Sequence, residues 1–217
     1  MKFNSIIFDW DGTLCQTLGL WVEGYRQGLN QLGISLQDDD IVQDFLHDHA
    51  QLEARYPSLR YDNLLTLAQE FVFQNIATSQ LYDGVMASLD HLANLGVKTA
   101  LVSTSPRHVL LAGVRAHGLE HRFSFILAGD EVARIKPDPE PFQTALRAIN
   151  SDPSDTLIIG DNRSDILAGR AAGTKTCLFA PHENQTYHDF DDLRRSGADF
   201  EIDHLQKLQP LNGREHA

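Results

Sequence analysis

The sequence predicts an α/β fold, in which a parallel β-sheet carries helices on both faces and a small α-helical domain is inserted near the N-terminus. Short β-rich runs alternate with longer helical patterns, which is typical of strand–helix–strand units. Most of these runs are almost continuously apolar, as expected for strands buried on both faces. A long early segment without any strand-like run indicates the insertion.

The expected elements follow one another in a regular order. Strands are predicted at residues 3–8, 97–103, 123–128, 156–160, 175–179 and, more weakly, 199–202. Helices between them are predicted at residues 84–95, 106–118, 139–150 and 164–173, with a surface helix at about 190–195. Pro106 and Pro139 suit first-turn positions of these helices, and Gly118 and Gly173 suit their ends.

The segment from about residue 17 to residue 83 contains helical patterns alone, at 18–32, 39–47 and 63–76. We therefore divide the chain into an α/β core, a helical domain and a tail, at residues 1–16 with 84–208, 17–83 and 209–217. Sites in open parallel sheets form at the carboxyl ends of the strands. An insertion that leaves the first strand at this end is expected to lie over such a site like a lid.

Composition and charge exclude several classes of function. The chain is 42% hydrophobic and 22% charged, close to soluble globular proteins. Its net charge of −12 repels nucleic acid and anionic membrane surfaces, so any phosphate site needs a local positive centre. No apolar stretch approaches the ~18–20 residues of a membrane span, and no signal-peptide pattern is visible. The two cysteines, Cys15 and Cys177, are far apart and fit a reduced, cytoplasmic chain.

The first strand ends in an acidic turn, Phe8-Asp9-Trp10-Asp11-Gly12-Thr13. Residues i and i+2 of an extended segment point to the same side, so Asp9 and Asp11 can face one pocket. Two carboxylates so close repel each other unless a cation or a proton joins them. Gly12 permits a sharp turn after them. The alternative is an ordinary Asp-rich turn that only ends a strand.

The fourth strand ends in a second acidic pattern, Gly160-Asp161-Asn162-Arg163-Ser164-Asp165. In a parallel sheet, Asp161 and Asp9 can converge at the same edge. Two carboxylates, a backbone carbonyl and waters would form an oxygen-only site, which suits Mg²⁺. Asp165, one turn into the next helix, could orient a ligand water. The alternative is that Asp161 and Asp165 only cap this helix.

Two further segments supply groups for an anion. The second strand ends in Ser103-Thr104-Ser105, where hydroxyls and helix-start N–H groups could hold phosphate. Lys136 lies in a proline-rich segment that could fix where its ammonium group points. Each signal is weak alone, because hydroxyls before a helix are usually caps and a loop lysine is usually solvated.

Taken together and in this order, the four motifs resemble the haloacid dehalogenase-like hydrolase superfamily. The resemblance is to the phosphatase branch that has a helical cap inserted after the first motif, and it spans most of the chain. The stretch of residues 160–173 is similar to members of the phosphoglycolate-phosphatase type. The resemblance implies a Rossmann-like core and a small phosphorylated metabolite as the partner, and it leaves the oligomeric state open.

The resemblance also implies roles for individual residues. Asp9 matches the nucleophile that becomes an aspartyl-phosphate, and Asp11 matches the general acid and base. Asp9, the Asp11 carbonyl and Asp161 match Mg²⁺ ligands, with Asp165 binding the ion or a water on it. Ser103 matches the hydroxyl that holds the phosphate, and Lys136 matches the cation that balances its charge. Thr104 and Arg107, beside Ser103, are expected to touch the substrate as well.

Departures from the family pattern narrow the choice of reaction. Asp11 argues against a true dehalogenase, since that branch lacks this second aspartate in the same role. Trp21 stands where β-phosphoglucomutase relatives carry a histidine, which argues against a mutase. The expected function is therefore Mg²⁺-dependent hydrolysis of a small phosphate monoester. The alternatives are a phosphosugar mutase and a non-catalytic binding protein of the same fold.

Overall fold

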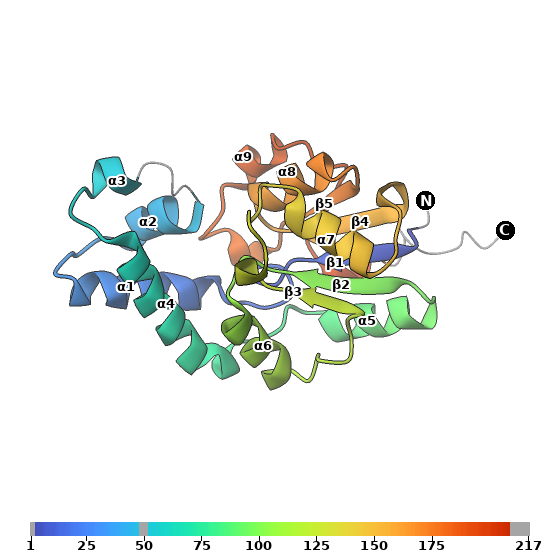
Figure 1. The fold of residues 1–217 in the computed structure, drawn as a ribbon, viewed down its shortest axis with the longest axis horizontal. Coiled ribbons are helices and arrows are strands. Elements are labelled where there is room, and N and C mark those ends of the chain that lie inside the picture. Colours follow the sequence, from blue (N-terminus) through green and yellow to red (C-terminus); the bar gives the residue numbers. More distant parts are fainter. Residues whose placement is uncertain (1–2, 48–51, 209–217) are drawn as a thin grey trace. The chain divides into compact units, whose positions relative to one another are not determined.

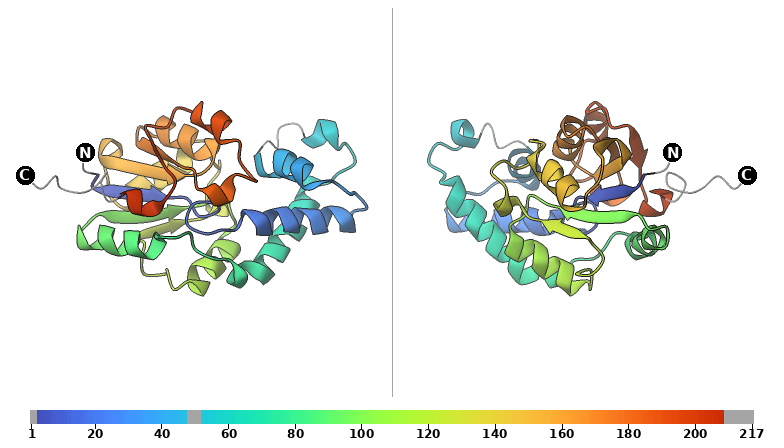
Figure 2. Two further views of the ribbon diagram at one scale, coloured as in Figure 1. Left: turned by 180° about the vertical axis from the view of Figure 1, so that it is seen from behind. Right: turned by 45° about the vertical axis from the view of Figure 1, so that its right-hand side comes forward.

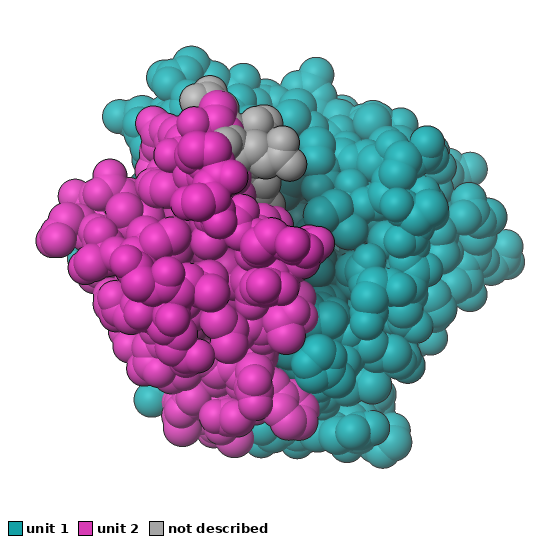
Figure 3. All heavy atoms as spheres, turned by 60° about the vertical axis from the view of Figure 1, so that its left-hand side comes forward, with its two compact units in different colours: residues 1–16, 80–217 teal, residues 17–79 magenta. Residues whose placement is uncertain are grey.

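The protein divides into two compact units, coloured separately in Figure 3. The computed structural model describes residues 3–47 and 52–208, so the tail expected at 209–217 lies outside the described residues. Unit 1 consists of residues 1–16 and 80–217, and unit 2 of Thr17–Ser79. Unit 2 thus ends at Ser79, earlier than the expected residue 83. Leu81 pairs with Cys15, and the Tyr82 ring lies edge-on to Phe179 at 5.2 Å, which ties these residues to unit 1.

Unit 1 is built on a six-stranded parallel sheet in the order β3-β2-β1-β4-β5-β6 (Figure 1). The strands are β1 (Ser5–Phe8), β2 (Lys98–Val102), β3 (Phe125–Leu127), β4 (Thr156–Gly160), β5 (Lys175–Phe179) and β6 (Phe200–Ile202). All six expected strands are present, and the predicted fold class is confirmed.

The strand order determines where a site can form. The chain runs outward from β1 to β2 and β3, and then crosses back to β4 on the other side of β1. Phe8 at the end of β1 is level with Leu101 of β2 and Ile159 of β4. The carboxyl ends of these three strands therefore meet at the point where the strand order reverses, which is the usual ligand position in such sheets.

Helices cover both faces of the sheet (Figures 1 and 2). Their bounds are α5 (Val85–Asn94), α6 (Arg107–Ala116), α7 (Glu140–Ala148), α8 (Arg163–Ala171) and α9 (Phe190–Arg194). Ile6 and Phe8 belong to the core beneath α5 and α6, while Ile7 belongs to the core beneath α7 and α8. The continuous apolar run of β1 is thus explained, because successive side chains enter opposite cores. Phe190 and Leu193 are also buried, so α9 is packed on one side.

The described part of unit 2 contains helices joined by turns and irregular segments, and no strand. Its helices are α1 (Leu18–Gln31), α2 (Asp38–Ile41), α3 (Leu52–Arg55) and α4 (Tyr61–Asn75). The helix expected at 39–47 begins as α2 and continues as a π-helical turn at Val42–His47. Gly24 and Gly28 of α1 lie one turn apart against α4, where a Cβ would come within 2.9 Å of the Ala68 carbonyl and 2.8 Å of Leu64 Cδ1. Two small residues therefore allow close packing of α1 on α4.

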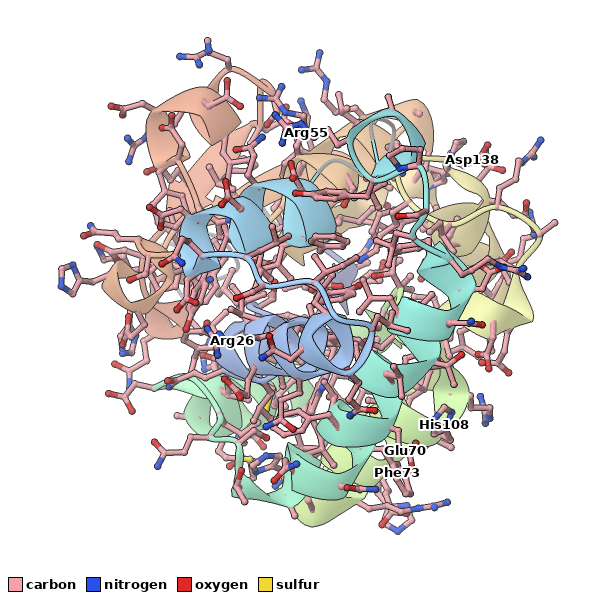
Figure 4. All side chains as sticks on the ribbon, turned by 90° about the vertical axis from the view of Figure 1, so that its left-hand side faces the viewer. Arg26, Arg55, Glu70, Phe73, His108 and Asp138 are labelled. Atoms are coloured by element: carbon pink, nitrogen blue, oxygen red, sulfur yellow. The ribbon has the colours of Figure 1, made fainter. Side chains whose placement is uncertain are left out.

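Unit 2 also encloses a carboxylate. Asp44 is buried and accepts hydrogen bonds from Arg55 and, at 2.8 Å, from the Tyr56 hydroxyl. Burial and the bond to Asp44 raise the pKa of Tyr56 to about 12. Arg26 likewise donates to Glu23 and Asp38, so the two arginines labelled in Figure 4 are both engaged by carboxylates.

Among the described residues, no helix combines the length and apolar character needed to cross a membrane.

Replacement of Leu110 by alanine is expected to destabilise unit 1. Leu110 is fully buried in α6 beneath the sheet, so truncation removes apolar contacts and leaves a cavity. The free energy of unfolding should fall by about 2–5 kcal/mol in urea denaturation. The matched control is Leu167→Ala, because Leu167 in α8 is 42% exposed. Equal losses for both variants would contradict the assigned core.

Candidate active site

The first strand delivers two carboxylates to the carboxyl edge of the sheet. Asp9 is buried, and its backbone N–H donates to the Ile159 carbonyl at 2.9 Å, which continues the pairing of β1 with β4. Asp11 is half-buried, and its Oδ2 accepts hydrogen bonds from Ser103 Oγ at 3.1 Å and from Ser105 Oγ at 2.7 Å. The two carboxylates thus share one edge of the sheet but bond to different partners.

Gly12 is required at the turn after these carboxylates for two reasons. Its φ of +77° lies in the left-handed region that side chains disfavour. A Cβ at this position would also stand 2.1 Å from Asp161 Oδ2. The glycine therefore lets the carboxylate from β4 approach the β1 turn closely.

Asp161 follows β4 and is held at both of its oxygens. Oδ1 accepts a hydrogen bond from Thr13 Oγ1 at 2.8 Å, and Oδ2 lies 2.6 Å from His188 Nε2. The Asp161 side chain is 2% exposed and the His188 side chain 1%. The orientation of this buried carboxylate is therefore fixed by groups from two other segments of the chain.

Asp165 serves the helix and the site at once. Its Oδ2 accepts the Asn162 backbone N–H at 3.1 Å, while the Asn162 side chain accepts the Ser164 N–H at 3.2 Å, so the two residues form a capping box at the start of α8. Its Oδ1 accepts from Lys136 Nζ at 2.6 Å. Oδ2 thus takes the expected capping role, while Oδ1 is bonded to Lys136.

Lys136 joins the carboxylates of two elements. Its Nζ donates to Asp9 Oδ1 at 2.5 Å and to Asp165 Oδ1 at 2.6 Å, and it lies 3.4 Å from the Val102 carbonyl. The ammonium group stands 5.8 Å from the centre of the Phe142 ring. With 5% of the residue exposed, this loop lysine is part of the interior.

The pKa directions follow from burial and from charge. Burial raises the pKa of the Asp9 carboxyl well above its usual range; Lys136 opposes this shift, while the Asp165 and Asp161 charges add to it. Burial likewise raises the pKa of Asp165 against the opposing effect of Lys136. Burial by itself would lower the pKa of Lys136, but the Asp165 and Asp9 charges outweigh it, so the pKa is raised. The lysine is therefore charged, and it does not fully balance the carboxylates around it.

The donor set fits a divalent cation. Asp9, Asp161 and Asp165 are all buried, and each offers a carboxylate oxygen within 4.8 Å of the others. The Lys136 ammonium group pairs with two of these three carboxylates, Asp9 and Asp165, so negative charge is left for a cation to neutralise. Oxygen-only ligands are the set that Mg²⁺ prefers. The Asp11 carboxylate lies outside this trio and is bonded to the two serines.

The remaining expected substrate contacts lie around the end of β2. Ser103 is buried there with its hydroxyl on Asp11, and Thr104 next to it is exposed. Arg107 begins α6, and its guanidinium donates to Glu131 Oε2 at 2.7 Å. An ion pair thus occupies the arginine in this structure, which sequence reasoning did not foresee.

Four further residues form contacts in the site that were not expected from the sequence, although Ser105 was already a candidate phosphate contact and Thr13 belongs to the first motif. They are Thr13, Ser105, Asn184 and His188. The spacing of Ser105, two residues after Ser103, could have suggested that both hydroxyls reach one partner. Asn184 and His188 come from the segment after β5, where no motif marks them. Their contacts depend on the completed sheet.

Comparison with known proteins identifies the family. The family model described as haloacid dehalogenase-like hydrolase matches residues 6–179. Pyrophosphatase PpaX from Anoxybacillus flavithermus is 34% identical over 183 residues, which cover 83% of this chain and 85% of the relative. Pyrophosphatase PpaX from Bacillus mycoides is 28% identical over 99% of both chains.

Solved structures share the fold. A candidate phosphoglycolate phosphatase from Lactobacillus plantarum superposes with a TM-score of 0.84 at 21% identity, over 97% of this chain and 100% of the other. CbbY from Rhodobacter sphaeroides, in complex with phosphate, superposes with a TM-score of 0.79 at 22% identity, over 95% of this chain and 96% of the other. Family model, relatives and fold agree with the resemblance inferred from the four motifs: this chain belongs to the haloacid dehalogenase-like hydrolases and is an enzyme of their phosphatase branch.

Proposed function

We propose that the protein is a Mg²⁺-dependent phosphatase that hydrolyses a small phosphate monoester through an aspartyl-phosphate on Asp9. The observation that carries the proposal is the buried trio of Asp9, Asp161 and Asp165, with Lys136 bonded to two of its members. Phosphoryl transfer depends mainly on positioning and on stabilisation of charge, and a preorganised set of carboxylates and one ammonium group suits both needs.

In the first half of the reaction, the Asp9 carboxylate attacks phosphorus and the bond to the leaving oxygen breaks. Asp11 gives its proton to that oxygen, and the alcohol departs. Ser105 and Ser103 hold the Asp11 carboxylate in place through its Oδ2. We propose that Lys136 and Ser103 donate hydrogen bonds to the phosphoryl oxygens. The Ser103 hydroxyl would then turn from Asp11 to the phosphate, while the Ser105 hydroxyl stays bonded to Asp11.

In the second half, Asp11 acts as a base. Its carboxylate takes a proton from water as the water oxygen attacks phosphorus, and the bond from phosphorus to Asp9 breaks. Inorganic phosphate and a free Asp9 carboxylate result, and Asp11 has regained its proton. One residue thus serves both halves, because each half leaves it in the protonation state that the other requires.

The trio and the Asp11 carbonyl would hold Mg²⁺. The ion would neutralise the buried negative charge, keep Asp9 ionised and allow an anionic ester to approach a chain whose net charge is −12. One Asp165 oxygen is bonded to the charged Lys136 ammonium group, which competes with a cation for it, and the other caps α8 at Asn162, so we propose that Asp165 binds the ion through a water.

The insertion point supports a cap role for unit 2. Its two connections run side by side at the base of the active-site turn, since Gln16 N–H donates to the Gln80 carbonyl at 2.8 Å and Cys15 pairs with Leu81. We propose that unit 2 selects the leaving group. We also propose that Thr104 contacts the substrate and that Arg107 does so only when it leaves Glu131. Neither Cys15 nor Cys177 is part of a disulfide, in keeping with the proposed cytoplasmic location.

Inorganic pyrophosphate is a second candidate substrate, because the relatives of 28% and 34% identity are named pyrophosphatases. Its cleavage needs the same groups, with phosphate in place of the alcohol. A mutase of the same fold would instead pass the phosphoryl group from Asp9 back to a sugar phosphate.

The decisive test is phosphate release from a panel of phosphoglycolate, a sugar phosphate, a nucleoside monophosphate and pyrophosphate. We expect release from at least one compound, and a loss of more than about 10³-fold in Asp9→Asn, because the nucleophile is gone. Asp191→Asn is the matched control, since that side chain is 85% exposed on α9. Isomerised sugar phosphate without net release would indicate the mutase, and turnover by Asp9→Asn would exclude Asp9 as nucleophile.

Mg²⁺ is expected to stabilise the folded protein in the absence of substrate, because an ion that binds only the folded state raises its stability. The melting temperature should rise with Mg²⁺ and fall back on addition of chelator. Asp161→Asn should lose most of this response, since it removes a charged oxygen from the trio. Asp191→Asn should retain it. Equal shifts in both variants would contradict the ligand assignment.

Lys136→Met should lower kcat/KM by about 10²–10³-fold, as removal of a charge-stabilising donor does elsewhere. Methionine keeps an unbranched side chain of nearly the same length but removes the ammonium group from Asp9 and Asp165. Lys175→Met is the control, because the Lys175 ammonium group forms an exposed ion pair with Asp199, outside the site. An unchanged kcat/KM in Lys136→Met would refute the charge-balancing role.

A further inference from the structure

The segment after β5 directs two buried polar side chains at the site. Asn184 is 1% exposed and His188 is 6% exposed. Asn184 Nδ2 donates to the Gly12 carbonyl at 2.8 Å, and His188 Nε2 lies 2.6 Å from Asp161 Oδ2. The mechanism above uses neither side chain, and buried polar groups of this kind need a reason to be there.

The His188 bond fixes how Asp161 is turned. A carboxylate oxygen accepts hydrogen bonds, so Nε2 carries the proton and donates it to Oδ2. Thr13 Oγ1 donates to the other oxygen at 2.8 Å. With one donor on each oxygen, the plane of the carboxylate cannot rotate without the loss of a buried hydrogen bond.

The position of His188 is itself determined by contacts. The Asn184 carbonyl accepts the His188 backbone N–H at 3.0 Å, which closes a turn between the two residues. Asn184 is anchored to Gly12 on one side and accepts from the Tyr82 hydroxyl on the other. The His188 ring also packs against Phe190, with 5.7 Å between ring centres. These contacts of Asn184 and Phe190 thus place the His188 imidazole next to Asp161.

We propose that His188 is a positioning residue, which holds the Asp161 carboxylate in the orientation that binds the divalent cation. The inference rests on the proposed function, because it concerns the same metal site. Hydrogen-bond partners of metal-binding carboxylates orient their ligands, and their loss weakens metal binding. His188 is not a ligand in this assignment: its Nε2 is engaged by Asp161, and the trio that converges within 4.8 Å does not include it.

Two substitutions of His188 distinguish the loss of its hydrogen-bond donor from the loss of the imidazole ring. The amide of His188→Gln stands near the place of Nε2 and can donate to Asp161, whereas the amide of His188→Asn stands near Nδ1 and cannot reach it. Mg²⁺ affinity is measured by calorimetry on the full chain without substrate. We expect His188→Asn to bind roughly 10–100-fold more weakly than wild type, and His188→Gln to recover most of that loss. His182→Asn is the control, since His182 is exposed on the same segment.

A kinetic readout distinguishes positioning from general damage. At saturating Mg²⁺, kcat of His188→Asn should return close to the wild-type value, because the loss lies in metal affinity. Wild-type Mg²⁺ affinity in His188→Asn, or a kcat that stays low at saturating Mg²⁺, would overturn the inference. Melting curves verify folding, and His188→Leu replaces the asparagine variant if that variant does not fold. Absence of Mg²⁺ binding by the wild type would overturn the proposed metal dependence, and this inference with it.

Discussion

The bridge of the Lys136 ammonium group between Asp9 and Asp165 is the interaction on which the site depends. It joins the end of β1, the loop after β3 and the first turn of α8, three segments far apart in sequence. Two buried carboxylates so close would repel each other, and removal of one partner from a buried ion pair typically costs about 3–5 kcal/mol. One lysine cannot neutralise three carboxylates, so the same arrangement that holds these segments together also leaves charge for a divalent cation.

The topology explains why these groups converge. Parallel pairing brings the ends of β1, β2 and β4 level, and the reversal of strand order beside β1 opens the edge between them. Glycine at two positions then permits close approach: a Cβ on Gly12 would collide with Asp161, and one on Gly160 would lie 2.3 Å from the Asp165 carboxyl carbon. Backbone geometry therefore sets the spacing of the carboxylates, and hydrogen bonds set their orientation.

Much of this arrangement could be predicted from local patterns. The six strands follow from apolar runs, Asp9 and Asp161 from their places directly after strands, and Asp165 from its place one turn into the helix after β4. The patterns were insufficient where a residue depends on distant partners. Asn184 bonds to the Gly12 carbonyl across 172 positions of the chain, and the π-helical turn at Val42–His47 is not marked by hydrophobic periodicity. Unit 2 ends at Ser79, earlier than the expected residue 83, because Leu81 pairs with Cys15, a contact between distant parts of the chain that local patterns do not reveal.

The central claim is that Asp9 forms a covalent intermediate. The most direct measurement is acid quenching of the enzyme within the first turnover of a ³²P-labelled ester from the panel, followed by peptide mapping. We expect an acid-stable, hydroxylamine-labile label on the peptide that contains Asp9, and no label in Asp9→Asn. Turnover of the ester with the label on another residue, or with no labelled peptide at any time point, would contradict it.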